Sequence, residues 1–161
     1  MEYKEFLDNA IKKIYENNFE EAIELLNESI KLKNDFEVSY FYRAVAYHSL
    51  EKYDEAILDY TKSIKLNPKM TDAYYNRAKI IIENPNSTKE KLEYAKEDLK
   101  NAIYQDEKFI DALFAMACVE KKLGKYHSAL EYLEKLLNIM PDAIHAKALK
   151  KLILTKYIVK D

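Results

Sequence analysis

Apolar and small residues recur along this chain at an interval of 34 residues, and within each interval they follow the helical period. The clearest copy is Glu37–Met70. If Glu37 is the first position of a unit, the first positions of the other units are Tyr3, Thr71 and Ile110. Two apolar segments with a polar turn between them fill each unit, which predicts a helix pair. A fixed period of this length predicts a stacked all-α array with units at 3–36, 37–70, 71–109 and 110–143.

The columns of the repeat have a physical explanation. The fourth position is large and apolar in every unit, where it holds Phe6, Tyr40, Tyr74 and Leu113. Two further positions are always alanine, namely Ala10, Ala44, Ala78 and Ala117, and then Ala22, Ala56, Ala95 and Ala129. Small residues let paired helices approach closely, and the large residue fills the space against the next helix. One helix pair cannot bury both of its faces, so the units must stack.

The second unit resembles the tetratricopeptide repeat family through Tyr40, Ala44, Tyr47, Ala56, Tyr60, Ser63 and Pro68. The resemblance extends over about residues 3–143. It implies a right-handed superhelical array of four helix-turn-helix repeats in a single domain, 1–161, followed by a C-terminal capping helix. The fourth unit departs from the family pattern at Glu120, where the family prefers tyrosine, and at Leu136, where it prefers a small residue.

The third unit contains a five-residue insertion near 83–91. Pro85 predicts that the first helix of this unit ends at or before Asn84. Ser87 with Glu90 forms a capping-box pattern, which predicts that the second helix restarts at Thr88. The inserted loop either contributes a contact or is simply a tolerated exposed loop, and we favour the second interpretation.

The C-terminal segment 144–161 is predicted to be a capping helix that begins near Ala143, with Asp142 as its cap. Its lysines lie opposite Ala148, Leu149 and Leu152, as is typical of a solvated terminal helix. The apolar residues beyond it, Leu154, Tyr157, Ile158 and Val159, have two interpretations. Either this end packs under the last repeat, or it contacts another chain, and a weak homodimer through it is a hypothesis.

Composition excludes several classes of protein. The content of 34% charged residues, one glycine and three prolines favours long helices over sheets. The net charge is −2, with an acidic body, so a basic face for nucleic acid is not expected. No apolar run is long enough for a membrane span. With a single cysteine and no signal-peptide pattern at the N-terminus, we expect a soluble cytoplasmic protein without a disulfide.

No pattern of catalytic or metal-binding residues occurs in the sequence. His48, His127 and His145 do not have the spacing of metal ligands, and Cys118 has no partner cysteine. No glycine-rich phosphate loop is present, and the carboxylates suit pairing with lysine on helix surfaces. We therefore expect neither an enzyme nor a cofactor.

The two arginines, Arg43 and Arg77, occupy the same position of consecutive units, while every other strong cation is lysine. This position therefore favours a planar guanidinium. One interpretation is recognition of a ligand carboxylate. We favour the other, in which a partly buried stem carries a head that is bonded to a carboxylate or carbonyl of a neighbouring helix.

The resemblance implies that the first helices of the pairs line a concave groove that binds peptides. Carried over position by position, the groove residues are Leu7, Ile11, Tyr15, Val38, Phe41, Tyr42, Val45, Tyr75, Asn76, Lys79 and Phe114. Some members of the family grip a carboxylate at the C-terminus of chaperone tails, but only Asn76 suits that pattern here. The apolar N-terminal half of the groove suits a protein or peptide segment with apolar anchors. The alternative is that the aromatic residues only pack between repeats.

These observations predict a non-catalytic scaffold or adaptor that binds a protein or peptide in the groove. A different class of function stays open, in which the protein is a dedicated chaperone that shields an apolar segment of a secreted or assembly-prone client protein. Copurification of one stoichiometric partner would favour the chaperone.

Overall fold

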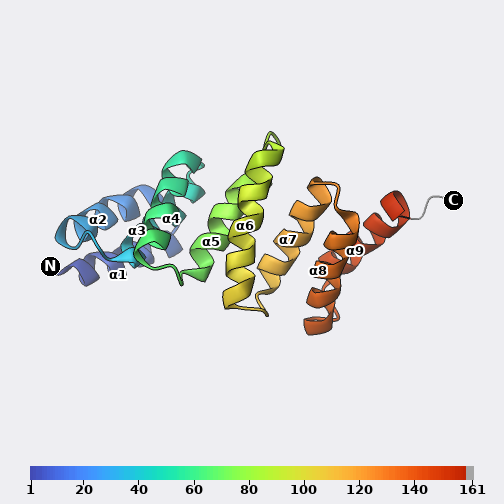
Figure 1. The fold of residues 1–161 in the computed structure, drawn as a ribbon. Helices are drawn as coiled ribbons and strands as arrows, with labels where there is room; N and C mark the ends of the chain where they lie inside the picture. The colour runs from blue at the N-terminus through green and yellow to red at the C-terminus, as the bar shows by residue number, and fades with distance from the viewer. Residues whose placement is uncertain (159–161) are drawn as a thin grey trace. The chain divides into compact units, whose positions relative to one another are not determined.

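The computed structural model describes residues 1–158, which form α-helices and one final π-helical turn without β-strands. The helices are α1 (Tyr3–Tyr15), α2 (Phe19–Leu32), α3 (Glu37–Ser49), α4 (Tyr53–Leu66), α5 (Thr71–Glu83), α6 (Lys89–Gln105), α7 (Ile110–Lys122), α8 (Tyr126–Ile139), α9 (Ile144–Ile153) and the turn η1 (Leu154–Ile158) (Figure 1). None of the described helices is both long and apolar enough to cross a membrane. The prediction of an all-α protein is confirmed for the described residues.

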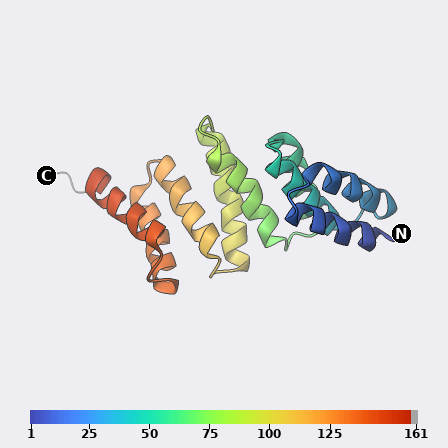
Figure 2. The same cartoon turned by 180° about the vertical axis from the view of Figure 1, so that it is seen from behind.

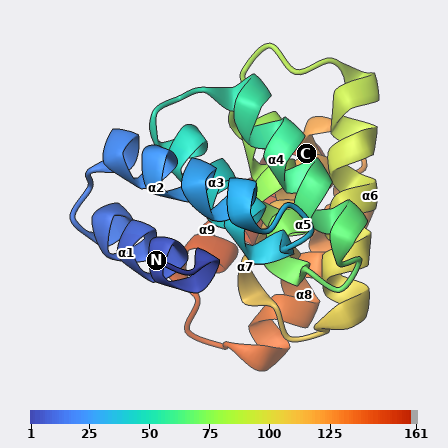
Figure 3. The same cartoon turned by 90° about the vertical axis from the view of Figure 1, so that its left-hand side faces the viewer.

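The chain divides into two compact units, Met1–Ile80 and the part from Ile81 onward. In the first unit, α1 pairs with α2, α3 pairs with α4, and α2 packs on α3 (Figure 3). In the second unit, α6 packs on α7, α7 pairs with α8, and α9 packs on α8 (Figure 2). The single domain and the handedness of the superhelix stay predictions.

The repeat positions coincide with helix starts. Tyr3, Glu37, Thr71 and Ile110 are the first residues of α1, α3, α5 and α7. The aromatic residues Phe19, Tyr53 and Tyr126, which precede the second alanine column, begin α2, α4 and α8. The 34-residue interval is therefore the length of one helix pair with its two connections.

Every residue of the two alanine columns has no exposed surface. In the first unit, Leu7 and Leu26 complete one core with Ala10 and Ala22, and Tyr60 completes a second with Ala44 and Ala56. In the second unit, the core around Ala117 and Ala129 includes Leu113, Leu133, Leu136 and Ile153. Because a side chain larger than alanine would separate the paired helices, these columns set the helix spacing.

The connections from α1 to α2, from α3 to α4 and from α7 to α8 are short turns, and each contains one residue with a left-handed backbone conformation. Asn17 and Glu51 have a φ of 58°, and Gly124 has a φ of 75° at the equivalent position. Glycine adopts this conformation without the steric cost that a Cβ adds. A Cβ at Gly124 would meet no atom within 4 Å, so only the backbone conformation favours glycine there.

The left-handed position of this turn predicts opposite changes in stability for two substitutions. Replacing Glu51 with glycine is expected to raise the free energy of unfolding by about 0.5–1 kcal/mol, because it removes the cost of a left-handed residue with a side chain. Gly124→Ala should lower it by a similar amount. Chemical denaturation followed by circular dichroism checks both, since the chain contains no tryptophan. Changes of the same sign in the two variants would contradict this account.

The five-residue insertion is divided between a helix and a loop. The connection from α5 to α6 covers Asn84–Thr88, whereas that from α3 to α4 covers only Leu50–Lys52. Helix α6 has 17 residues against 14 in α4. The end of α5 at Glu83 agrees with the effect predicted for Pro85. The predicted capping residue was wrong by one position, because the Thr88 hydroxyl accepts the bond from Lys91 N (3.3 Å) while the Ser87 hydroxyl donates to the Ile81 carbonyl (2.5 Å).

The C-terminal segment packs under the last helix pair. The Tyr157 ring stacks on Tyr126 with centroids 4.2 Å apart, and Ile158 packs against the core of the second unit. The predicted capping helix 144–161 is helical from Ile144, and its residues after Ile158, Val159 among them, lie outside the described residues. The prediction that Asp142 caps it was wrong, because Ala143 is the capping residue and gives no side-chain bond.

Candidate peptide-binding clefts

The first unit has a cleft between α3 and α5 with α4 beneath it, which we name the α3–α5 cleft. Its volume is about 400 Å³. It is lined by Val45, His48, Ser49, Glu51, Tyr53, Tyr60, Asn76 and Lys79. The helical period sets this arrangement, because Val45 and His48 share one face of α3 while Asn76 and Lys79 share one face of α5. Three of the predicted groove residues, Val45, Asn76 and Lys79, therefore lie in one cleft.

Tyr60 lies in the wall of the α3–α5 cleft and has no exposed surface. Its hydroxyl makes no hydrogen bond of normal geometry within the described residues, although the Asn76 side chain lies near enough to affect it. Burial raises the pKa of the Tyr60 phenol above its ordinary value, and the Asn76 side chain opposes that rise only in part. The hydroxyl is therefore neutral at physiological pH. A buried polar group without a partner is costly, so a ligand that shifts the side chains covering this hydroxyl and bonds to it would recover free energy.

The other predicted groove residues of the first unit mostly pack between helices. Leu7 is part of a buried core, and Ile11, Val38 and Tyr42 pack against that core. Phe41 contacts the rings of Tyr42 and Tyr60 edge-on or tilted, with centroids 5.3 Å and 5.9 Å away. Tyr75 is half-buried, and Tyr15 is 82% exposed. Packing between helices, the alternative interpretation, thus describes much of the apolar set.

Phe114 lies in the second unit, in a cleft between α7 and α9 that is closed by the end of α8. We name it the α7–α9 cleft, and its volume is about 380 Å³. It is lined by Ile110, Asp111, Phe114, Leu136, Met140, Asp142, Ala143, Ile144, His145 and Ala146. The sequence did not indicate the contribution of Met140 and Ile144, because these residues belong to the connection and the capping helix rather than to the repeat template.

Arg43 belongs to the packing of the first unit. Its Nε and Nη2 donate to the two carboxylate oxygens of Asp59 (2.6 Å and 2.9 Å), and Nη1 donates to Asn27 Oδ1 (2.8 Å). The hydrogen bond to Asp59 raises the pKa of the guanidinium against the opposing effect of burial. Arg77 Nη1 donates to Thr61 Oγ1 at 2.9 Å. The interpretation of Arg43 as a structural residue is confirmed.

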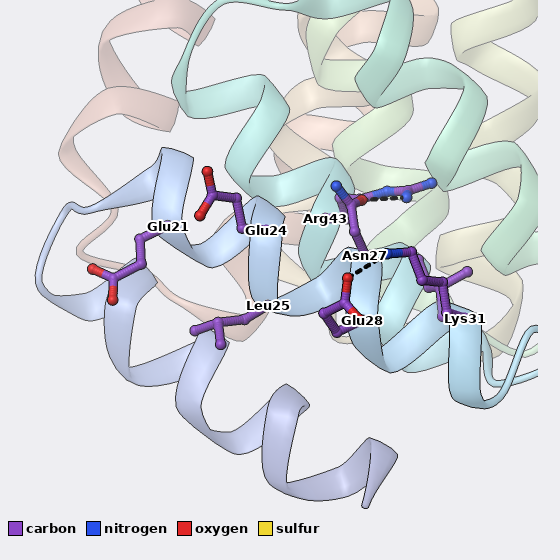
Figure 4. Close-up of a pocket in the computed structure, with 8 residues that line it drawn as sticks. Glu21, Glu24, Leu25, Asn27, Glu28, Lys31 and Arg43 are labelled. Atoms are coloured by element: carbon purple, nitrogen blue, oxygen red, sulfur yellow. Dashed lines mark hydrogen bonds and ion pairs between the residues drawn. The ribbon is translucent and has the colours of Figure 1, made fainter. Parts of the chain in front are cut away.

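Arg43 also lines a hollow on α2, of about 710 Å³, with Glu21, Glu24, Leu25, Asn27, Glu28, Ile30 and Lys31 (Figure 4). Figure 4 shows Arg43 turned toward Asn27, while Lys31 pairs with Glu28 on the same helix. Arg43 is held by Asp59 and Asn27, and Lys31 is paired. Two of its three glutamates are also paired, Glu21 with Lys13 and Glu28 with Lys31, so the hollow has few groups left to select a ligand.

The sequence also did not indicate a buried ion pair in the second unit. Lys96 on α6 lies 2.8 Å from Glu120 on α7, and the two side chains are 13% and 2% exposed. The hydrogen bond to Glu120 raises the pKa of Lys96. The second oxygen of Glu120 has no hydrogen-bond partner among the described residues. Glu120 stands where the family prefers tyrosine, and that departure is the only indication of the ion pair in the sequence.

The described residues contain no group of three or more histidines, cysteines or carboxylates that could hold a metal ion. Cys118 is half-buried, and burial raises the pKa of its thiol. A raised pKa lowers the fraction of thiolate, so this cysteine lacks the activation that a nucleophile requires.

Comparison with known proteins identifies the repeat. Residues 38–70 and 110–143 each match the tetratricopeptide repeat. The chain therefore contains repeats of the tetratricopeptide repeat family. Proteins of this family are scaffolds for protein–protein interaction.

Two curated relatives align with half or more of this chain, but the aligned region is a small part of each relative. The chain is 24% identical over 152 residues to a tetratricopeptide repeat and J domain-containing co-chaperone of Cryptococcus neoformans, covering 91% of this chain and 29% of the relative. It is 36% identical over 88 residues to the human mitochondrial import receptor subunit TOM70, covering 52% of this chain and 13% of the relative. The chain thus spans less than a third of either relative.

Solved structures share the fold. A crystal structure of MamA has a TM-score of 0.85 at 21% identity, covering 95% of this chain and 81% of that one. The Thermus thermophilus tetratricopeptide repeat protein TTC0263 has a TM-score of 0.72 at 15% identity, covering 95% and 81%. At these identities the likeness shows the fold alone, and it confirms the prediction of a helical repeat array.

Proposed function

We propose that this protein is a non-catalytic adaptor that binds an extended segment of another polypeptide along the first helices of its repeats. The α3–α5 cleft carries this proposal. Side chains from two first helices line it, and it contains the Tyr60 hydroxyl without a partner. The donors and acceptors of Tyr60 and Asn76 suit a peptide group, which offers one N–H and one carbonyl. Location in the cytoplasm stays part of the proposal.

Tyr60→Phe tests the proposal. Selection from a phage-displayed library of random dodecapeptides supplies the probe, which is then synthesised and titrated against purified protein. We expect the variant to bind the selected peptide about tenfold more weakly, equivalent to about 1.4 kcal/mol. Its free energy of unfolding should be unchanged or higher, because the lost hydroxyl has no partner within the described protein.

Tyr104→Phe is the matched control, because Tyr104 is 88% exposed and lies outside both clefts. It should change neither binding nor unfolding. A library that yields no peptide for the wild-type protein would refute the proposed function. Equal affinity of wild type and Tyr60→Phe would show that the α3–α5 cleft is not the binding site.

A chaperone that shields an apolar segment is the second candidate. The exposed Ile139, Met140 and Ile144 of the second unit favour it, since they offer apolar surface to a client. A relative described as a co-chaperone is consistent with it. Copurification of one partner at a fixed ratio, together with aggregation of that partner when it is expressed alone, would distinguish the chaperone from a general adaptor.

A further inference from the structure

The α7–α9 cleft differs in chemistry from the α3–α5 cleft. Its walls are Ile110, Phe114, Leu136, Met140 and Ile144. Phe114 and Ile110 are partly buried and pack against the core of the second unit, so they form a fixed wall. Met140 and Ile144 are 47% and 77% exposed, which leaves the opposite wall open to solvent. The cavity has room for a large apolar side chain, whose burial contributes about 1.5–3 kcal/mol.

Two carboxylates, Asp111 and Asp142, flank this apolar cleft. Both side chains are exposed, and Asp111 makes no ion pair in the described part of the chain. Asp142 lies 3.6 Å from Lys147, but both side chains are exposed to solvent and the pair is correspondingly weak. His145 is the remaining titratable group of the lining. The rim is thus acidic around an apolar centre.

We propose that the α7–α9 cleft binds a bulky apolar side chain of a polypeptide partner that carries lysine or arginine beside it. The apolar side chain enters between Phe114 and Ile144, and the neighbouring cation lies against Asp111 or Asp142. This inference rests on the proposed function and adds the chemical class of the partner. The arrangement favours such a segment over an acidic one, because an acidic neighbour would face like charge at the rim.

The test compares the peptides that the protein selects from the phage-displayed library of random dodecapeptides. Wild-type protein should enrich peptides with a bulky apolar residue next to lysine or arginine. Ile144→Asp should lose that enrichment, because it places a charge in the apolar wall at an exposed position where folding tolerates it. The double variant Asp111→Lys/Asp142→Lys should instead enrich peptides with aspartate or glutamate beside the apolar residue.

Leu58→Asp is the matched control, since Leu58 is a 70% exposed aliphatic residue of α4 in the first unit. It should keep the wild-type preference, and Tyr60→Phe should keep it too, because Tyr60 lies in the other cleft. Circular dichroism must show that each variant is folded. Peptides that bind wild type and Ile144→Asp equally would overturn this inference and leave the proposed function intact, whereas absence of any selected peptide would overturn both.

A second copy of the chain is the competing occupant of the cleft. Sedimentation velocity distinguishes it, because a wild-type dimer that Ile144→Asp converts to a monomer would place another protomer in the cleft and overturn the proposal. A wild-type monomer that selects apolar–basic peptides would support it.

Discussion

Replacing Lys96 with methionine is expected to lower the free energy of unfolding by about 3 kcal/mol. The substitution keeps the length of the side chain and removes its charge, so Glu120 is left almost fully buried without a counterion. Breaking a buried ion pair from one side costs more than the pair itself contributes, because the remaining charge loses its compensation. Urea denaturation followed by circular dichroism at pH 7 measures this cost.

The double variant Lys96→Met/Glu120→Leu should regain most of that loss or exceed wild type, because an apolar pair avoids the desolvation of two charges. Lys100→Met is the control, since Lys100 and its partner Glu97 on the same helix are both exposed and the pair is solvated. It should unfold like wild type. A double variant that is no more stable than Lys96→Met would contradict the interpretation of Glu120 as an uncompensated charge.

The pH dependence follows from the raised pKa of Lys96. A cation whose pKa is higher in the folded state contributes its full stabilisation below the pKa of the unfolded chain and loses it as pH rises through the folded value. The difference between wild type and Lys96→Met should therefore be largest at neutral pH and shrink only above the ordinary lysine range, near 10.5.

Positions governed by helix packing could be predicted from the sequence. The alanine columns determine how closely two helices approach, so their recurrence identified the helix pairs and the positions where helices start. Arg43 was recognised because arginine occurs at one repeated position only. In each case one residue type is required by a local contact, and the requirement recurs with the repeat.

Properties that depend on what surrounds a residue could not be predicted. Tyr60 fits the packing template, and nothing in the sequence shows that its hydroxyl has no partner. Glu120 departs from the family pattern, but its ion pair requires Lys96, which lies in the preceding repeat. The α7–α9 cleft depends on Met140 and Ile144, which the repeat template does not include. Such sites arise where the regular pattern ends.

Replacing Arg43 with lysine is expected to lower the free energy of unfolding by about 2 kcal/mol. The guanidinium holds both oxygens of Asp59 and the Asn27 side chain at once, and so connects α2, α3 and α4. An ammonium on a flexible stem cannot reproduce that planar geometry. Asp59 is only 7% exposed, so Arg43→Met should cost more, about 3 kcal/mol, because its carboxylate then has no counterion.

A double-mutant cycle separates the two partners of Arg43. If the guanidinium connects three helices, Asn27→Ala should destabilise the wild-type protein but have little further effect in Arg43→Met, because its hydrogen-bond donor is already lost. Lys12→Met is the control, since Lys12 is exposed and lies outside this network. Unfolding of Arg43→Lys at the wild-type denaturant concentration would show that charge alone is sufficient at this position. A loss that is additive with Asn27→Ala would confine the role of Arg43 to its pair with Asp59.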